Sequence, residues 1–406
     1  MAIIALSSES PIVFAGMSWA NGLKIVSLWG MLLVVTNDFG PRAGGIETFI
    51  IGLIQRMPHA QTMVYTSSQG DTRTYDAAWF ANYGVKVIRD RSKILLPTPR
   101  VCRAVSRIVK SQKIDVVAFG AAAPLAIMAH RLRRAGARRI IALTHGHEVW
   151  WSKVFPFSLA LRRIGTTTDV LTYLGEFTRS AISKSLTTTA SHAMVKIAPG
   201  IDTEHFAPTD STALRSSLGL SGKKVIVCVG RLVHRKGQDY LIESMRAIIN
   251  ELSDAHLLLI GEGPYRTHLM NLVKKFNLED HVTFVGRIQY ADLPNYICVG
   301  DVFAMPSRTR FCGLEVEGLG IVYLEASACS LPVIAGASGG APDAVIDGVT
   351  GVVVDGRDCA AIAVAAINLL ENPERARTMG TAGRAWIVDK WRWQRWADEF
   401  VKLLVH

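Results

Sequence analysis

The chain has 406 residues, 49% of them apolar, which is enough for two ordinary hydrophobic cores. Its formal charge of +11 favours an anionic partner: a nucleic acid, an anionic membrane surface or a phosphorylated substrate. No apolar run approaches the roughly 18 residues of a membrane-spanning helix. The six cysteines are scattered without a CxxC pair, which excludes a zinc or disulfide framework and predicts free thiols in a reducing cytosol.

Residues 1–30 precede the first predicted strand. They begin with an apolar stretch but lack the basic residues that open a secretory signal, and Met31 stands immediately before the strand. Two interpretations stay open: a disordered or interfacial extension, or a chain read from a start upstream of the natural one. We favour the second and assign residues 1–30 no role.

The first half alternates predicted strands with helices. A buried strand at Leu32–Thr36 is followed by Gly44 and Gly45 and by a helix at Ile46–Met57. Such a glycine pair lets backbone amides approach a phosphate or a sugar, although an ordinary tight turn has the same residues. Further strands are expected at Thr62–Thr66, Val85–Arg89, Asp115–Phe119 and Arg139–Thr144. This alternation predicts a parallel, doubly wound α/β sheet.

Basic segments are concentrated in this half, at Pro99–Gln112, His130–Arg139 and, with aromatic residues, Trp150–Arg163. The ordinary interpretation of a basic amphipathic helix is a solvated face over a core. Together with the nearby aromatic residues, these segments also suit docking on anionic lipid. Nucleic acid is not expected, because no helix-turn-helix, RRM or zinc-finger pattern is present.

The sequence THGHE places His145 and His147 at the end of a predicted strand, where α/β folds bind ligands. A metal site is not expected, because no third ligand cluster accompanies the two histidines. Further along, the proline-bracketed segment Pro199–Pro208 is typical of an interdomain linker.

The second half opens with a strand at Lys224–Val229, followed by Arg231 and Lys236 in one loop and a helix at Tyr240–Ile249. The loop can bring both cations to one diphosphate, although two surface charges would look the same. Further strands are expected at Leu257–Gly263, Val282–Ile288 and Val352–Asp355, and the tryptophan-rich segment Trp386–Val405 predicts a terminal helix.

Two glutamates, Glu317 and Glu325, lie in the segment between the strands predicted at Asp301–Ser307 and Leu331–Ala335. Glu317 precedes a helix predicted at Leu319–Cys329, and Glu325 lies about two turns into it, on the same side. Gly318 and Gly320 remove side chains at the helix start, so a phosphate can reach the amides of Leu319, Gly320, Ile321 and Val322. The arrangement suits a nucleotide-sugar, with Glu317 on the sugar and Glu325 on the ribose; the alternative is two solvated charges.

The Glu317–Glu325 spacing, in a unit ending PVIAGASGG, resembles the retaining glycosyltransferases of the GT-B class, which have two Rossmann-like domains facing a cleft. The segment FCGLEVEGLGIVYLEASACSLPVIAGASGGAPDAVIDGVTGVVVD is similar to that of GDP-mannose-dependent phosphatidylinositol mannosyltransferases, and the similarity extends from about Leu32 to the tryptophan-rich end. The usual glycine loop of these enzymes has a second proline where this chain has Gly40.

The resemblance implies roles for individual residues. Gly44 and Gly45 would lie near the donor diphosphate, and the nucleobase would lie against the backbone at Ile288. His145 would contact the transferred sugar, with His147 as the alternative. Arg231, Lys236 and the amides after Gly318 would hold the diphosphate. The expected catalytic residues are His145, Arg231, Lys236 and Glu317. The expected donor-binding residues are Gly44, Gly45, Arg231, Lys236, Ile288, Gly318, Leu319, Gly320, Ile321, Val322 and Glu325.

We therefore expect an acceptor domain at 31–200, a linker at 201–209, a donor domain at 210–385 and a terminal helix at 386–406 that crosses back to the first domain. The expected activity is metal-independent and cofactor-free transfer of mannose from GDP-mannose to a phosphatidylinositol mannoside-type lipid. The protein would be cytoplasmic and peripheral at the inner face of the plasma membrane. The alternatives are a transferase using a UDP-sugar and a small soluble acceptor, and a non-catalytic protein that binds nucleotide-sugars.

Overall fold

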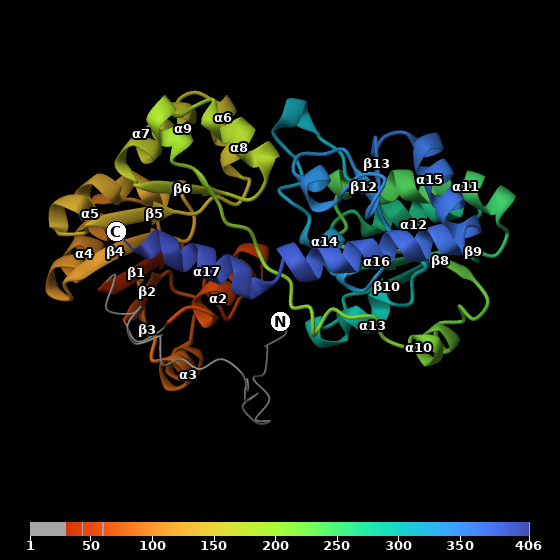
Figure 1. Ribbon diagram of the computed structural model, residues 1–406, viewed down its shortest axis with the longest axis horizontal. Coiled ribbons are helices and arrows are strands. Elements are labelled where there is room, and N and C mark those ends of the chain that lie inside the picture. The colour runs from red at the N-terminus through yellow and green to blue at the C-terminus, as the bar shows by residue number, and fades with distance from the viewer. Residues whose placement is uncertain (1–29, 43, 59–60, 406) are drawn as a thin grey trace. The chain divides into compact units, whose positions relative to one another are not determined.

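A computed structural model describes residues 30–42, 44–58 and 61–405. The segment 1–29, for which two interpretations were left open, lies outside the described residues. The chain divides into two compact units (Figure 1). Unit 1 contains Met1–Tyr173 as far as it is described, with Ala181–Ala198 and Trp393–His406, and unit 2 contains Leu174–Ser180 and Pro199–Arg392.

Unit 1 is built on a parallel sheet of seven strands within the described residues, in the order β3-β2-β1-β4-β5-β6-β7. The strands are β1 (Met31–Thr36), β2 (Thr62–Thr66), β3 (Lys86–Arg89), β4 (Ile114–Phe119), β5 (Arg139–Ala142), β6 (Val170–Tyr173) and β7 (Val195–Lys196). The sheet order reverses between β1 and β4, and such a switch point opens a crevice beyond the carboxyl ends of the two strands.

The helices between these strands are α2 (Gly45–Gln55), α3 (Arg73–Tyr83), α4 (Pro99–Ser111), α5 (Ala129–Ala135), α6 (Glu148–Lys153), α7 (Phe157–Thr167), α8 (Glu176–Ser183) and α9 (Thr188–His192). The apolar face of α4 shows how they pack: Val101, Val105 and Val109 recur at helical spacing and are buried in the core, while its arginines face outward.

Unit 2 has a six-stranded parallel sheet within the described residues, in the order β10-β9-β8-β11-β12-β13. Its strands are β8 (Lys224–Val229), β9 (Ala255–Ile260), β10 (Val282–Gly286), β11 (Val302–Met305), β12 (Val333–Gly336) and β13 (Gly351–Val354). Its helices include α10 (Thr212–Ser217), α11 (Gln238–Glu251), α12 (Arg266–Lys275), α13 (Leu293–Ile297), α14 (Ile321–Ala328), α15 (Cys359–Glu371) and α16 (Pro373–Lys390). Here the switch point lies between β8 and β11.

The two sheets confirm the predicted doubly wound α/β architecture, and most predicted strands fall within two residues of the observed ones. The reason is that buried parallel strands read as short apolar runs, such as LLVVT in β1, where every residue from Leu32 to Thr36 is buried.

The single terminal helix predicted over Trp386–Val405 is wrong. The chain forms α16, which ends at Lys390, and α17 (Trp393–Leu404), with Trp391 buried at the break. The carbonyl of Trp391 accepts a hydrogen bond from the Ile201 amide at 2.7 Å, so this carbonyl is used outside the helix. Periodicity alone does not reveal such a break, because apolar spacing continues through it.

Helix α17 is grouped with unit 1 and lies beside α2 (Figure 1). Its Trp393 ring packs on Gly52, where an added Cβ would come within 2.4 Å of the ring, and the Arg56 guanidinium lies 5.1 Å from the ring centroid. A glycine at this point of α2 therefore makes room for the tryptophan of the last helix.

Candidate active site

Two of the predicted site residues of unit 2 lie at its switch point. Lys236 follows β8 and Glu317 follows β11, the two strands on either side of the reversal. The Lys236 ammonium lies 2.8 Å from Glu317 Oε2, and the Arg235 guanidinium lies 3.9 Å from the same oxygen. Both Lys236 and Glu317 are buried. The chain thus places a buried ion pair where this fold class binds ligands.

Close backbone packing holds Lys236 in this position. Lys236 ends a short 3₁₀ helix, His234–Lys236, and Gly237 then adopts a φ of +74° before α11 begins. A Cβ on Gly237 would lie 1.9 Å from the Pro306 carbonyl oxygen, so only glycine fits where the loop after β8 meets the end of β11. The loop is therefore pinned to the neighbouring strand that leads toward Glu317.

The surroundings of Glu317 favour its ionised form. Burial alone would raise the pKa of the carboxyl, but the attraction of Lys236 and Arg235 and a hydrogen bond from the Gly318 amide hold the pKa below its ordinary value. Its backbone is fixed as well, because the Gly340 amide donates to the Glu317 carbonyl at 2.8 Å. The glycine turn after β12 therefore supports this carboxylate.

Helix α14 begins at Ile321, two residues later than predicted, because Gly320 takes a φ of +77° and caps it. Gly318, Leu319 and Gly320 therefore form the approach to the helix rather than its first turn, and Glu325 lies about one turn in rather than two. The amides of Ile321 and Val322 are at the helix start, where N–H groups have no intrahelical acceptors. This start can still bind a phosphate.

Tyr323 fixes α14 to the sheet. Its hydroxyl lies 2.7 Å from the Met305 carbonyl at the end of β11 and 2.9 Å from Ser307 Oγ, and the ring is fully buried. The sequence analysis missed this residue. A tyrosine among the buried residues of this helix was the available signal, because a buried tyrosine hydroxyl usually has a hydrogen-bond partner.

Glu325 differs from Glu317. It is also buried, but within the described residues no basic side chain lies at ion-pair distance from its carboxylate. Burial raises its pKa from 4.5 to about 7, and the more distant charge of Lys236 only partly offsets this. A buried carboxyl of this kind is poised to gain partners from a ligand.

The other predicted donor residues of unit 2 lie at the same edge of the sheet. Arg231 is exposed just beyond β8, and no ion pair to it is found within the described residues. Ile288 is half-buried in the loop after β10. The structure therefore brings Lys236 and Glu317 into direct contact, with Glu325 within reach of the lysine's charge. Arg231 follows β8 and Ile288 follows β10, and β9 lies between these two strands.

Unit 1 holds the remaining predicted residues: Gly44, Gly45 and His145. Gly44 caps α2, where an added Cβ would lie 2.3 Å from Glu47 Oε2, and Gly45 is exposed with open space around it. His145 follows β5. Its Nε2 contacts the Gly120 carbonyl, which can only accept, so Nε2 carries the proton and Nδ1 is left as the ring's acceptor. Burial lowers the pKa of His145, so the ring is neutral at pH 7.

His147, the second histidine, contacts the Ala123 carbonyl at 3.2 Å and lies 3.2 Å from the buried Glu148 carboxylate. Glu148 also accepts a hydrogen bond from the His145 amide at 3.0 Å. Within the part of the chain that is described, no three His, Cys, Asp or Glu residues are grouped so as to hold a metal ion.

The sequence analysis did not name one half-buried carboxyl group of unit 1. Asp38, directly after β1, shares charge interactions with Glu47, His147 and Glu148. Burial and the charge of Glu47 raise the pKa of Asp38, Arg42 at 3.7 Å opposes them, and the net pKa is about 6. A position directly after a strand at the switch point was the available signal. A carboxyl group here can exchange hydrogen bonds with hydroxyl groups.

Comparisons with known proteins agree with this geometry. The family description "Glycosyltransferase Family 4" matches residues 43–205, and "Glycosyl transferases group 1" matches residues 210–386. Among solved structures, Anabaena HepE in complex with UDP aligns with a TM-score of 0.78 at 19% identity, covering 92% of this chain and 99% of that one. Sucrose-phosphate synthase from Thermosynechococcus elongatus aligns with a TM-score of 0.73 at 22% identity, covering 92% and 98%. These likenesses show the fold.

The fold and the strand-end sites define a glycosyltransferase of the GT-B class. Similar proteins with named activities indicate which family within this class the chain belongs to. A Mycolicibacterium smegmatis protein named "GDP-mannose-dependent alpha-(1-6)-phosphatidylinositol monomannoside mannosyltransferase" is 44% identical over 92% of this chain and 98% of its own length. A Corynebacterium glutamicum protein, named as acting on the monoacylated lipid, is 42% identical over 92% and 97%. The chain belongs to this family of phosphatidylinositol monomannoside mannosyltransferases, within glycosyltransferase family 4, which confirms the resemblance seen in the sequence.

Opposite effects on stability are expected from the two glutamates of the ligand-free protein. With the pKa of Glu325 raised from 4.5 to about 7, the folded state keeps a proton that the unfolded chain releases, so stability falls as pH rises from about 4.5 to about 7. Glu325→Gln removes this cost and should raise the free energy of unfolding at pH 8 by up to roughly 3 kcal/mol, with the gain shrinking toward pH 4.5.

Glu317→Gln is the matched control. Because the pKa of Glu317 is lowered, its ionised form stabilises the fold above about pH 4.5, its ordinary value, and that stability is lost as pH falls through the folded-state pKa. The variant should therefore be less stable than the wild type at pH 8, and the loss should shrink at acid pH. Urea unfolding at several pH values measures both effects. A change of the same sign for both variants at pH 8 would contradict the assigned charge states.

Proposed function

We propose that the protein transfers mannose from GDP-mannose to a phosphatidylinositol mannoside-type lipid, with retention of the anomeric configuration. The observation that carries the proposal is the buried Lys236–Glu317 pair beside the start of α14, in a chain 42–44% identical to enzymes named for this reaction. A ligand with adjacent diphosphate and sugar groups gives each member of this pair a partner of its own.

The leaving diphosphate would be stabilised by groups from two strand ends. Lys236 and Arg231 supply positive charge, and the amides of Ile321 and Val322 supply donors at a helix start. Such fixed donors and charges act most strongly where negative charge develops, which is on the leaving phosphate in the transition state. Because Lys236 is already held by Glu317 and by the Gly237 turn, its position costs little reorganisation.

The two glutamates would divide the rest of the donor. Glu317, beside Lys236, accepts hydrogen bonds from hydroxyls of the transferred sugar. Glu325, about one turn along α14, accepts from the two ribose hydroxyls, and these bonds favour its ionised form despite its burial. In unit 1, the free Nδ1 of neutral His145 would accept a hydrogen bond from the transferred sugar.

The carboxylates of unit 1 do not favour a double displacement. Glu47 is paired with Arg42 at 2.7 Å, and Glu148 is fully buried and bonded to the His145 amide. Asp38, whose pKa is raised to about 6, is mostly ionised at neutral pH but lies 3.7 Å from the Arg42 guanidinium, which it shares with Glu47. A covalent intermediate needs an ionised carboxylate beside the scissile bond. We therefore propose same-face attack, in which the leaving phosphate takes the proton of the acceptor hydroxyl.

A panel of donors tests this activity. The protein should transfer radiolabelled mannose from GDP-mannose to an organic-extractable product when phosphatidylinositol monomannoside is supplied. GDP-glucose, UDP-glucose and UDP-N-acetylglucosamine should give turnover at least about tenfold lower, because a missing or misplaced hydrogen bond to a charged group costs about 1.5–3 kcal/mol. Preference for a UDP-sugar, or transfer to a small soluble acceptor, would favour the alternative functions.

Docking of unit 1 on an anionic membrane is the second part of the proposal. None of the helices within the described residues is long and apolar enough to cross a bilayer. The structure also shows that some of the basic residues named in the sequence analysis bind other parts of the protein and are therefore not available to bind lipid. Arg100 is bound bidentately by Asp90 at 2.6 and 2.9 Å, Arg133 pairs with Asp169 at 2.7 Å, and Arg139 bonds the Leu403 carbonyl. These three arginines are engaged within the protein, so we do not include them in the proposed lipid-binding surface.

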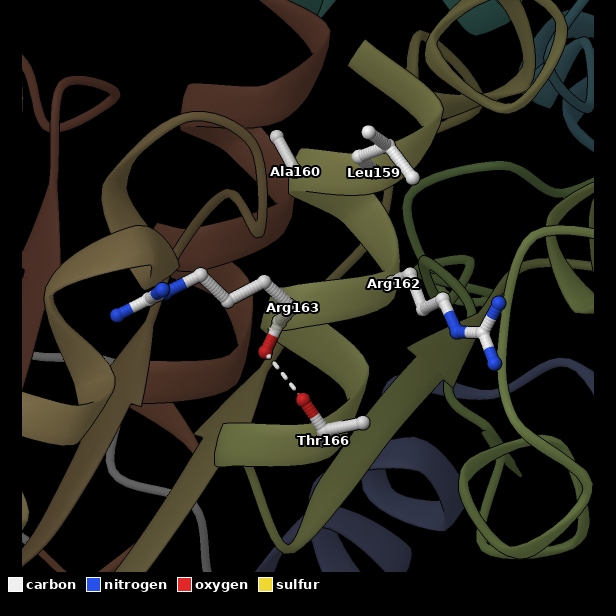
Figure 2. Close-up of a pocket in the computed structure, with 5 residues that line it drawn as sticks. All are labelled: Leu159, Ala160, Arg162, Arg163 and Thr166. Atoms are coloured by element: carbon white, nitrogen blue, oxygen red, sulfur yellow. Dashed lines mark hydrogen bonds between the residues drawn. The ribbon is translucent and has the colours of Figure 1, made fainter. Parts of the chain in front are cut away.

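Helix α7 carries a better candidate surface. Arg162 and Arg163 are exposed, and Figure 2 shows their guanidinium groups extending from the helix in opposite directions beside a pocket lined by Leu159, Ala160 and Thr166. Leu159 is 55% exposed, and Phe155, at the turn before α7, is 77% exposed. Exposed apolar side chains flanked by arginines suit the boundary between lipid headgroups and acyl chains.

Removing both arginines, in Arg162→Ala/Arg163→Ala, should weaken binding to anionic vesicles by roughly 30-fold, because each basic residue near such a surface contributes about 1 kcal/mol. The control Arg73→Ala/Lys86→Ala removes the same charge from two other exposed positions of unit 1 and should change binding little. Sedimentation with vesicles measures both. Equal losses in the two variants, or equal wild-type binding to neutral vesicles, would contradict docking through α7.

A further inference from the structure

Two cysteines that the catalytic proposal does not use lie side by side in unit 2. Cys298 directly follows α13, and Cys329 directly follows α14. Their segments run together: a Cβ on Gly300 would lie 3.0 Å from the Leu331 side chain, and β11 and β12, which begin just beyond, are paired. The Cys329 side chain lies close enough to the Cys298 sulfur to lower the pKa of Cys298, and in its protonated form the Cys298 thiol donates to the Ala207 carbonyl at 3.6 Å.

The two thiols differ from each other in exposure and in acidity. Cys298 is half-buried, whereas Cys329 is buried behind it. The hydrogen bond from Cys329, with those from Thr209 and the charge of Arg384, lowers the pKa of Cys298 to about 6. A partly exposed, acidic thiol next to a second thiol is the arrangement found in oxidisable cysteine pairs, because the first sulfur reacts and the second resolves it.

We propose that Cys298 and Cys329 form a reversible disulfide on exposure to a peroxide. The Cys298 thiolate attacks one peroxide oxygen, breaks the O–O bond and becomes a sulfenic acid. The sulfur of Cys329 then displaces hydroxide from that sulfenic acid, and its proton leaves with the hydroxide as water. The two thiols together lose two hydrogens, and hydrogen peroxide becomes two waters. A dithiol reductant reverses the reaction by thiol–disulfide exchange.

The disulfide would act on the donor helix through its end. Cys329 follows the last residue of α14, and its amide bonds the carbonyl of Glu325 at 3.1 Å. A disulfide brings two sulfurs to about 2.05 Å, well inside hydrogen-bond distance, so the ends of α13 and α14 must move together. Glu325 lies one turn away, and a displacement of about 1 Å at a binding group can cost on the order of 100-fold in rate.

The end of α14 is also linked, through Arg384, to the segment Thr203–Ala207. The Arg384 guanidinium donates to the Ala328 carbonyl at 2.6 Å, to the Phe206 carbonyl at 2.6 Å and to the Thr203 carbonyl at 2.9 Å. Cys298 itself bonds Ala207. Oxidation would remove that last contact, so it would alter both the donor helix and the segment Thr203–Ala207 that Arg384 holds against it.

Peptide mapping of the whole protein tests the disulfide directly. Reduced protein treated with hydrogen peroxide should lose two hydrogens in mass and give a cross-linked peptide joining Cys298 to Cys329. Cys329→Ser should stop at a sulfenic acid on Cys298, which dimedone traps, and Cys298→Ser should form neither product. Cys312→Ser removes the exposed cysteine and should behave as the wild type. Oxidation of Cys312 without a 298–329 cross-link would overturn the proposal.

Turnover of GDP-mannose tests the consequence and rests on the proposed function. Peroxide should lower wild-type turnover about tenfold or more, dithiothreitol should restore it, and Cys298→Ser should resist. A cross-link that leaves turnover unchanged would overturn the link to the donor helix. A protein that forms the cross-link yet transfers no mannose even when reduced would instead contradict the proposed function and leave the disulfide established.

Discussion

The buried ion pair between Lys236 and Glu317 is the interaction on which the donor site depends. Two opposite charges removed from water recover their lost hydration only with close geometry and further hydrogen bonds. Here the ammonium and the carboxylate are 2.8 Å apart, and the Gly318 amide supplies one further bond. Removing either partner would leave the other charge buried and uncompensated, so the two residues form one unit in the ligand-free protein.

The backbone around this pair is built to hold it. Gly237 lets the loop after β8 touch the end of β11, and the glycine turn after β12 bonds Glu317 from the other side. Tyr323 then fixes the start of α14 to the end of β11. Three neighbouring strands thus position one carboxylate, one ammonium and one helix start. This is the preorganisation that electrostatic catalysis requires.

Glu325 shows the opposite arrangement, and the contrast explains how the site can receive a ligand. Its carboxyl is buried without an ion-pair partner at contact distance within the described residues, so it destabilises the ligand-free fold at neutral pH. Ribose hydroxyls would supply the missing hydrogen bonds. The protein therefore pairs one carboxylate with a lysine and leaves the other without an ion-pair partner at contact distance, which is the carboxylate that we propose the donor binds.

Much of this was predictable from sequence, and the exceptions have physical reasons. Short apolar runs located the strands, and the spacing of Glu317 and Glu325 drew attention to the segment that the structure buries beside Lys236. The start of α14 was misplaced because Gly320 adopts a left-handed conformation that sequence spacing does not reveal. The helix break before Trp393 could not be predicted, because it depends on a contact with the distant residue Ile201. The ion pair between Arg100 and Asp90 depends on side-chain geometry that the sequence does not show. Asp38 was overlooked because its environment, rather than its neighbours in sequence, raises its pKa.

Calorimetry with GDP and GDP-mannose on Glu317→Ala and Glu325→Ala tests the division of roles between the two glutamates most directly. Loss of a hydrogen bond to a charged group costs about 1.5–3 kcal/mol, or roughly ten- to more than hundredfold in affinity. Glu325→Ala should weaken both ligands by this factor, because both contain the ribose. Glu317→Ala should weaken GDP-mannose and largely spare GDP. If Glu317→Ala lost GDP as strongly as Glu325→Ala did, the assignment of Glu317 to the transferred sugar would be contradicted.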